Sequence, residues 1–321
     1  MCKFRSRVRP LLGALAVLVL GTTAAVAEGP SATRLVSGLR GATGSTIGPD
    51  GALYVTEGAA GRISRVDPKS GAVTTFASGL PTAVLRIGGA IDVAFLDETA
   101  YVLVTLVGPD VGGSNVVGIY RIDGPDRFTV IADIGAFSLE NPPQTPFFIP
   151  TGVQFALETY RGGLLVTDGH HNRLLGVTLD GEISELMAFA NIVPTGLAVW
   201  GRTVFMAEAG PVPHLPENGR VVAFGSKLPV TTVAAGAPLL VDVEFAPGRT
   251  LYALAQGIWN GVSEGSPALP FTGALVQANE DGTFTVILGG LDRPTSLEFI
   301  GNTAYVVTLT GEIWKIDGLS R

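Results

Sequence analysis

Cysteine is nearly absent from this chain of 321 residues, which has one, Cys2, and only three histidines. Cys2 lies in an N-terminal segment that we expect to be removed. The remaining chain is therefore expected to have no disulfide bond, no thiol nucleophile and no thiolate metal ligand. A lipid anchor is not expected either, because lipidation needs a cysteine at the cleavage point, where the sequence has Ala27-Glu28.

Long apolar runs and basic clusters are also missing beyond Ala27. Gly, Asp or Arg interrupts each apolar run within about ten residues, well short of the ~20 that a membrane-spanning helix needs. Without residues 1–27, 17 Lys and Arg side chains remain against 28 Asp and Glu, a formal charge of −11. An acidic chain without a basic cluster is not expected to bind nucleic acid or anionic lipid.

The N-terminus has the layout of a signal peptide. Basic residues between Lys3 and Arg9 precede an apolar run from Leu11 to Leu20, and Ala25-Val26-Ala27 matches an A-x-A cleavage site. We predict cleavage after Ala27 and a periplasmic or extracellular protein, with an uncleaved N-terminal anchor as the alternative. The predicted organisation is a signal peptide over residues 1–27 and one domain over residues 28–321.

An internal repeat predicts the fold. The phrase at Pro150-Thr151-Gly152-Val153 recurs at Pro194-Thr195-Gly196-Leu197 and at Pro294-Thr295-Ser296-Leu297. The first interval is 44 residues, within the 40–45 residue period of four-stranded propeller blades. In the first unit, Pro49-Asp50-Gly51 is typical of a hairpin turn, because glycine accepts the positive φ that such turns require.

We therefore predict an all-β, six-bladed β-propeller, and a β-sandwich is the alternative. The last unit supplies only three strands, whereas a spare strand at Thr33–Gly38 precedes the first unit. The two ends are expected to complete one blade, which removes an open sheet edge. The predicted units span residues 41–79, 80–134, 148–191, 192–236, 237–290 and 291–318.

Three stretches carry a resemblance to a known family: GPDGALYVTE, PTGLAVWGRTVFMAEAG and VDVEFAPGRTLYALAQG. They resemble the ScyD/ScyE family of exported propellers, which is related in pattern to NHL-repeat and gluconolactonase-like propellers. The resemblance spans nearly all of the chain after residue 27. It implies a six-bladed propeller outside the cytoplasm but brings no agreed reaction and no catalytic motif.

The long connections between second and third strands predict where a ligand binds. They span residues 107–115, 210–219 and 257–272, and all open on one face of a propeller, which makes that face the expected binding site. Asp92 and Asp242 are predicted at the starts of innermost strands on the same face, where they are candidate calcium ligands. The other candidate ligand-binding residues there are Glu57, Glu208, Asp168, His170 and Trp259.

Each candidate also has a structural interpretation. Carboxylates that end a propeller strand commonly accept hydrogen bonds from neighbouring backbone, and Asp92 and Asp242 could cap exposed N–H groups. His170 and its neighbour His171 have no partner at metal-ligand spacing, so a solvated loop pair is the alternative for them. Trp259 belongs to an apolar insert that could form a ligand wall or cover an exposed blade.

Three functions fit the sequence. The first is a non-catalytic exported binding or scaffold protein for a small molecule or a partner, with calcium as an optional ion. The second is a calcium-dependent lactonase or esterase of the gluconolactonase kind, although the matching inner-strand starts carry Thr151, Thr195 and Thr295. The third is a quinone-dependent sugar dehydrogenase, because residues 48–66 also resemble the opening repeat of those enzymes.

Overall fold

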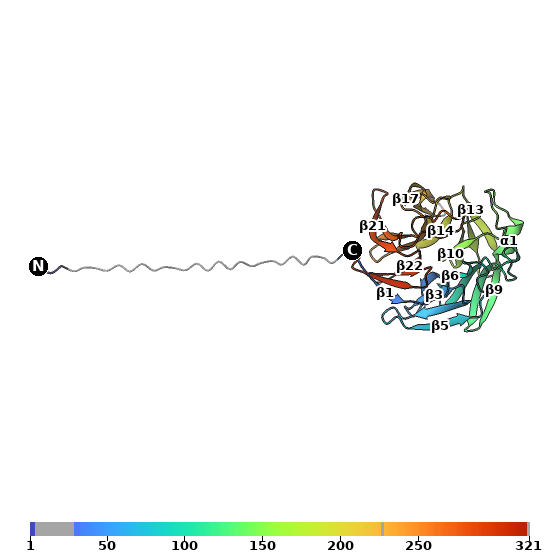
Figure 1. The fold of residues 1–321 in the computed structure, drawn as a ribbon, viewed down its shortest axis with the longest axis horizontal. Coiled ribbons are helices and arrows are strands. Elements are labelled where there is room, and N and C mark those ends of the chain that lie inside the picture. The colour runs from blue at the N-terminus through green and yellow to red at the C-terminus, as the bar shows by residue number, and fades with distance from the viewer. Residues whose placement is uncertain (4–28, 226–227, 320–321) are drawn as a thin grey trace.

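Six four-stranded antiparallel sheets make up the protein, in a computed structural model that describes residues 1–3, 29–225 and 228–319. The signal peptide predicted over residues 1–27 lies almost wholly outside the described residues. Figure 1 shows the sheets following one another around a ring in chain order. The fold is the predicted six-bladed β-propeller, with blades whose sheets are β2–β5, β6–β9, β10–β13, β14–β17, β18–β21 and β22–β24 with β1.

Each blade runs from an innermost strand at the channel to an outermost strand at the periphery. The inner strands are β2 (Ala42–Ile47), β6 (Gly89–Leu96), β10 (Gln154–Tyr160), β14 (Pro194–Trp200), β18 (Leu240–Phe245) and β22 (Pro294–Ile300). The second strands are β3 (Leu53–Glu57), β7 (Thr99–Thr105), β11 (Gly163–Asp168), β15 (Thr203–Glu208), β19 (Leu251–Ala255) and β23 (Thr303–Thr308).

The third and outermost strands complete the blades. The third strands are β4 (Arg62–Val66), β8 (Gly118–Gly124), β12 (Arg173–Val177), β16 (Arg220–Gly225), β20 (Gly273–Ala278) and β24 (Ile313–Asp317). The outermost strands are β5 (Val73–Ser78), β9 (Arg127–Asp133), β13 (Ile183–Ala188), β17 (Leu228–Ala235), β21 (Phe284–Leu291) and β1 (Ser31–Val36). One α-helix, α1 (Ile134–Glu140), and two single-turn 3₁₀ helices, Pro109–Val111 and Pro216–Asn218, lie in connections.

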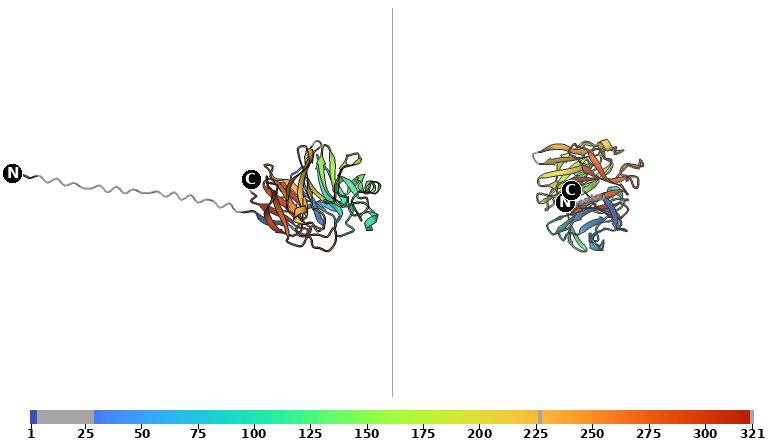
Figure 2. Two further views of the ribbon diagram at one scale, coloured as in Figure 1. Left: turned by 90° about the horizontal axis from the view of Figure 1, so that it is seen from above. Right: turned by 90° about the vertical axis from the view of Figure 1, so that its left-hand side faces the viewer.

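The two ends of the chain close the ring. Strand β1 pairs antiparallel with β24, so that Ser31 lies opposite Asp317 and Arg34 opposite Trp314. Figure 2 shows the C-terminal strands (red) beside the N-terminal strand (blue). The prediction that an N-terminal strand completes the last blade is confirmed. Closure pairs the edge strand that would otherwise be open to aggregation.

Apolar residues on both faces of the strands explain why the blades pack side by side. Buried clusters join neighbouring blades, as where Tyr101 and Leu103 of β7 pack with Val166 of β11. The second strand of blade one, β3, is buried along its whole length. Such strands read as continuous apolar runs rather than as alternating ones.

The repeated phrase does not mark equivalent places in every blade. In blade four, Pro194 pairs with Glu208, the last residue of the second strand. In blade three, the residue that pairs with the last residue of the second strand is Gln154 and not Pro150. Thr151 therefore precedes the inner strand of blade three, and its hydroxyl donates to Asp110. The prediction that Thr151 starts an inner strand is wrong, because β10 begins at Gln154 and the phrase in this blade lies in the link that precedes the strand.

The connections sort onto two faces. Second-to-third strand connections and the links between blades open on one face, which we call the long-loop face. The short turns after the first and third strands open on the opposite face, the turn face. Gly51 shows why these turns form, with φ of 75° in the Gly48–Ala52 hairpin predicted from the sequence.

Candidate functional site

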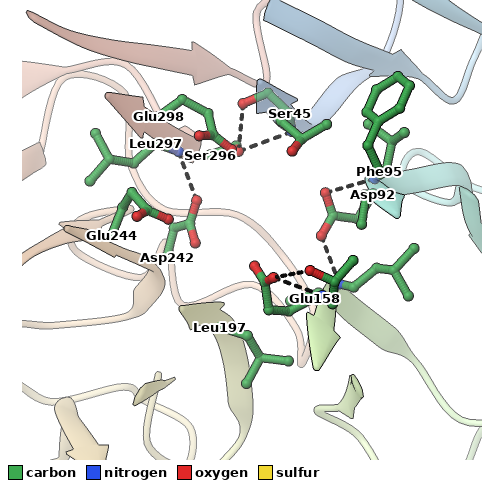
Figure 3. Close-up of a pocket in the computed structure, with 16 residues that line it drawn as sticks. Ser45, Asp92, Phe95, Glu158, Leu197, Asp242, Glu244, Ser296, Leu297 and Glu298 are labelled. Atoms are coloured by element: carbon green, nitrogen blue, oxygen red, sulfur yellow. Dashed lines mark hydrogen bonds between the residues drawn. The ribbon is translucent and has the colours of Figure 1, made fainter. Parts of the chain in front are cut away.

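A polar cavity of about 70 Å³ lies in the central channel. Its wall carries five carboxyl side chains that come from four inner strands (Figure 3). They are Asp92 of β6, Glu158 of β10, Asp242 and Glu244 of β18, and Glu298 of β22. Among the described residues, no lysine, arginine or histidine lines the cavity.

Asp92 and Asp242 each tie two neighbouring inner strands together. Asp92 Oδ1 accepts from the Val93 amide, and its Oδ2 accepts from the Leu157 amide of blade three at 2.7 Å. Asp242 repeats this arrangement with the amides of Val243 and Leu297, the latter in blade six at 2.7 Å. All four carboxyl oxygens therefore bond to backbone N–H groups, as the capping interpretation expects.

The positions of these two residues correct one prediction. Asp92 is the fourth residue of β6 and Asp242 the third of β18, so both lie inside the channel and not at the mouth on the long-loop face. In the described part of the chain, no three His, Cys, Asp or Glu side chains are grouped to hold a metal ion. The geometry does not support calcium ligation by Asp92 and Asp242, and we assign both a structural role.

Three cavity residues escaped the sequence analysis: Glu158, Glu244 and Glu298. Glu158 and Glu298 occupy equivalent positions in the Leu-Glu pairs of β10 and β22, which alignment of the inner strands would have brought together. Glu158 accepts from the amide and hydroxyl of Thr159. Glu244 accepts from the Phe245 amide, whereas we find no hydrogen bond to Glu298 among the described residues.

These five residues are half-buried, and their carboxyls lie in a cavity whose described lining carries no positive charge, which favours their protonated forms. Desolvation raises the pKa of Glu158 and of Asp242 to about 7, and that of Glu244 to about 8. Desolvation and the neighbouring carboxylates also hold the pKa values of Asp92 and Glu298 well above the ordinary range, although the backbone donors to Asp92 oppose the rise. Near neutral pH these channel carboxyls therefore hold protons.

The acids that end second strands form part of the framework. Glu57, Asp168 and Glu208 close β3, β11 and β15 as predicted, and all three are buried. Glu57 accepts two hydrogen bonds from Arg62, at 2.7 and 3.0 Å, and one from the Arg40 amide. Glu208 pairs with Arg220. These contacts give the carboxylates a structural role.

Asp168 belongs to a buried network with His171 and Arg173. Its Oδ1 accepts from the Val153 and His171 amides, and Arg173 donates to His171 Nδ1 at 3.0 Å. Because His171 is 2% exposed, the interpretation of His170-His171 as a solvated loop pair is wrong. His170 Nε2 accepts from the Phe148 and Ile149 amides, and desolvation lowers the pKa of this imidazole.

Trp259 belongs to the β19–β20 connection, residues 256–272, which reaches other blades. The indole Nε1 donates to Ser266 Oγ at 3.1 Å, and its ring lies 6.3 Å from the His214 ring of blade four. Glu264 of the same connection lies 3.9 Å from His170 of blade three. The connection therefore extends over the long-loop face from blade five to blades four and three.

The same connection contains a Gly-x-Ser-x-Gly sequence, Gly261–Gly265, that the sequence analysis did not single out. In α/β-hydrolases this motif forms a sharp turn between a strand and a helix. Here it lies in an irregular loop between β19 and β20, with no helix after it. The motif therefore does not form a nucleophile elbow.

Large apolar side chains are exposed unevenly over the described residues. Eleven lie on the long-loop face, in interblade links and long connections, whereas only Leu179 and Trp200 lie on the turn face. In five blades, the outermost strand exposes one large apolar side chain. The eleven are Val84, Leu85, Leu139, Phe147, Phe148, Val212, Leu215, Ile258, Val262, Leu269 and Phe271.

Eight of these residues lie on segments that contact one another over blades three to five. The Phe148 ring lies 4.3 Å from the His170 ring, and His170 approaches the 256–272 connection, which in turn meets His214. We call this set the apolar surface. It comprises Phe147, Phe148, Val212, Leu215, Ile258, Val262, Leu269 and Phe271.

Comparison with solved structures supports the architecture. Virginiamycin B lyase from Staphylococcus aureus is similar over 89% of this chain and 98% of that chain, with a TM-score of 0.57 and 14% identity. A gluconolactonase from Xanthomonas campestris is similar over 89% and 88%, with a TM-score of 0.61 and 11% identity. The chain shares their fold.

A third similar structure is the PQQ-bound aldose sugar dehydrogenase from Streptomyces coelicolor. The similarity covers 92% of this chain and 99% of the dehydrogenase, with 16% identity and a TM-score of 0.57. No protein-family model and no curated protein sequence matches the chain. The structural similarity establishes the propeller fold, and the low sequence identities leave the activity open. None of the helices in the described residues is long and apolar enough to cross a membrane.

Proposed function

We propose that the chain is an exported, non-catalytic binding propeller of the ScyD/ScyE type, which docks a protein partner on its long-loop face. The observation that carries this proposal is the apolar surface, eight exposed large side chains on three segments that are linked through His170 and His214. Contiguous exposed apolar patches on soluble proteins mark interaction sites more often than chance. Export depends on the signal peptide predicted over residues 1–27.

A protein partner fits this surface better than a small molecule does. Small-molecule sites are concave and bury most of the ligand, whereas Phe148, Ile258 and Phe271 are 61%, 58% and 69% exposed. Aromatic side chains are enriched where protein interfaces form their buried core. The 256–272 connection presents such residues on a rigid propeller, the arrangement in which loops commonly carry binding groups.

Paired variants of the exported protein test the proposal. Phe148→Ser with Phe271→Ser removes two exposed rings from the apolar surface, and Val230→Ser with Val286→Ser makes a matched change on outer strands. We expect cross-linking in the producing cells to yield a complex with wild type and with the outer-strand variant, at least tenfold reduced in the surface variant. Equal complex formation by both variants would refute the proposal.

Lactone hydrolysis is the second candidate, favoured only by the fold shared with a gluconolactonase. The calcium that such chemistry uses does not fit the described residues, because no set of three ligating side chains is grouped to hold it. Quinone-dependent oxidation fits no better, since the cavity contains neither histidine nor a basic side chain. A lactone screen with and without calcium is expected to show no turnover, and calcium is expected not to raise the melting temperature measured in chelator.

A further inference from the structure

We propose that the five channel carboxyls act as a proton-held lock, which keeps the inner strands together while protonated and loosens them as the carboxyls ionise. The lock is distinct from the binding surface, because it lies inside the channel on the walls of a cavity of about 70 Å³. Two of its members join neighbouring blades: Asp92 accepts from the Leu157 amide between blades two and three, and Asp242 accepts from the Leu297 amide between blades five and six.

No group in the cavity neutralises these carboxyls. Strand β2 contributes Ser45 and Thr46, and β14 contributes Leu197, so neither strand adds a charge. Strands β6, β10, β18 and β22 contribute only acidic titratable groups to the lining. Like charges held together in a small cavity repel strongly. Ionisation of several carboxyls therefore raises the free energy of the folded propeller.

Hydrogen bonding does not compensate the three glutamates as it does the two aspartates. Asp92 and Asp242 each accept a backbone hydrogen bond from the next blade, which stabilises a negative charge. Glu158 and Glu244 accept only from the residue that follows each of them, and the described residues include no donor to Glu298. Glu244 and Glu298 are therefore the positions where a negative charge is least stabilised.

The direction of the pH effect follows from proton linkage. Desolvation raises the pKa of Glu158 and Asp242 to about 7 and that of Glu244 to about 8, against about 4 in an unfolded chain. The native state therefore binds more protons than the unfolded state between these limits. The contribution of the five channel carboxyls to the free energy of unfolding is greatest below about pH 4 and is lost as the pH rises through about 7 to 8.

Other groups act at lower pH. Burial lowers the pKa values of His170 and His214, which makes stability rise with pH only up to their unfolded value near 6.5. The pKa of Glu57 is lowered by its hydrogen bonds despite burial, so its contribution changes only at acidic pH. Desolvation also raises the pKa of Glu208, outside the channel, so variants of the channel carboxyls are needed to assign the change between pH 7 and pH 8.5 to them.

Thermal melts of the exported protein, in chelator from pH 6 to 9, test the lock. For each extra proton held by the native state, the unfolding constant rises about tenfold per pH unit. We expect the melting temperature of wild type to fall from pH 7 to 8.5, and Glu244→Gln with Glu298→Gln to reduce that fall by at least half. The exposed pair Glu182→Gln with Glu280→Gln should behave as wild type.

The lock would be overturned if the melting temperature of wild type stayed constant or rose from pH 7 to 8.5. It would also be overturned if the melting temperature fell equally with pH in the Glu244→Gln/Glu298→Gln variant and in the Glu182→Gln/Glu280→Gln control. If the ring variant does not fold, infrared difference spectra of wild type decide the question. A band of protonated carboxylic acid at pH 6.5 that disappears by pH 9 supports the lock, and its absence at pH 6.5 refutes it.

Discussion

Asp92 of blade two and Asp242 of blade five make the same pair of hydrogen bonds three blades apart. Each accepts from the amide that follows it and from a leucine amide in the next inner strand, Leu157 or Leu297. Gly44 of blade one and Gly196 of blade four lie against these aspartates. The channel therefore has an approximate twofold pattern, in which blades one to three repeat as blades four to six.

Removal of one aspartate should destabilise the propeller. Asp92→Ala leaves the Val93 and Leu157 amides without their acceptor, at a cost of about 1–3 kcal/mol for each buried donor. We expect a loss of about 2–4 kcal/mol in the free energy of unfolding, measured by urea denaturation, and a smaller loss for Asp92→Asn. Asp281→Ala, in an exposed turn, is the control, and equal effects at the two sites would contradict the role given to Asp92.

The close approach of blades at Gly44 should exclude any side chain. A Cβ atom there would lie 2.2 Å from Asp92 Oδ1 and 2.6 Å from the Ile91 carbonyl oxygen. Overpacking of this kind costs about 1–3 kcal/mol, so Gly44→Ala should lower the melting temperature measurably. Gly289→Ala is the matched control, because a Cβ there meets no atom within 4 Å. A neutral Gly44→Ala would show that the inner strands can separate at no cost.

The buried ion pair of blade one should matter far more than an exposed one. Glu57 is fully buried and Arg62 half-buried, so Glu57→Ala removes the acceptor of Arg62, Ser64 and the Arg40 amide, and we expect a loss of about 2–4 kcal/mol. The exposed pair of Asp50 and Arg65 should contribute about 0–1 kcal/mol. Urea denaturation of Glu57→Ala and Asp50→Ala compares them, and similar losses would contradict this ranking.

The same Glu57 carboxyl gives stability an acidic limit. Burial opposes ionisation, but hydrogen bonds from Arg62, Ser64 and the Arg40 amide lower its pKa below the ordinary 4.5. Its contribution is present above about pH 4.5 and is lost as the pH falls further. Wild type should therefore lose stability below this pH more steeply than Glu57→Gln, and parallel curves would show that Glu57 is not the group responsible.

Export should remove the N-terminal segment. Cleavage after Ala27 predicts that the exported protein begins at Glu28, which intact-mass measurement of the periplasmic and culture fractions checks. Ala27→Phe places a bulky residue where signal peptidase requires a small one, so unprocessed protein should accumulate. Full-length protein in the membrane fraction, with none beginning at Glu28 in the other two fractions, would favour the uncleaved anchor.

The sequence predicted the blades because their signals are local. Turn glycines, apolar strands and the spare strand at Thr33–Gly38 follow from neighbouring residues, and they led to six blades and to closure by β1. The register of blade three could not be predicted in this way. Pro150 opens the same phrase that begins the inner strand of blade four, and only pairing with β11 shows that Gln154 begins the strand in blade three.

The carboxyl ring was less accessible to sequence reasoning. Its members come from four strands separated by many residues, and the sequence alone does not say which side of an inner strand faces the channel. Asp92 and Asp242 were singled out because they were predicted at the starts of inner strands, whereas Glu158, Glu244 and Glu298 are each the fifth residue of theirs. Their equivalent registers against Leu165 and Tyr305 bring them to one cavity.

The most direct test of the binding face uses a photoreactive alkyl diazirine, which labels exposed apolar surface without knowledge of the partner. Labelled peptides of the exported protein are mapped by mass spectrometry. We predict that labelling concentrates in residues 141–149, 209–219 and 256–272 and falls when the partner is cross-linked. Labelling spread evenly over outer strands and turn face, or unchanged in the complex, would contradict the assignment of the long-loop face as the binding site.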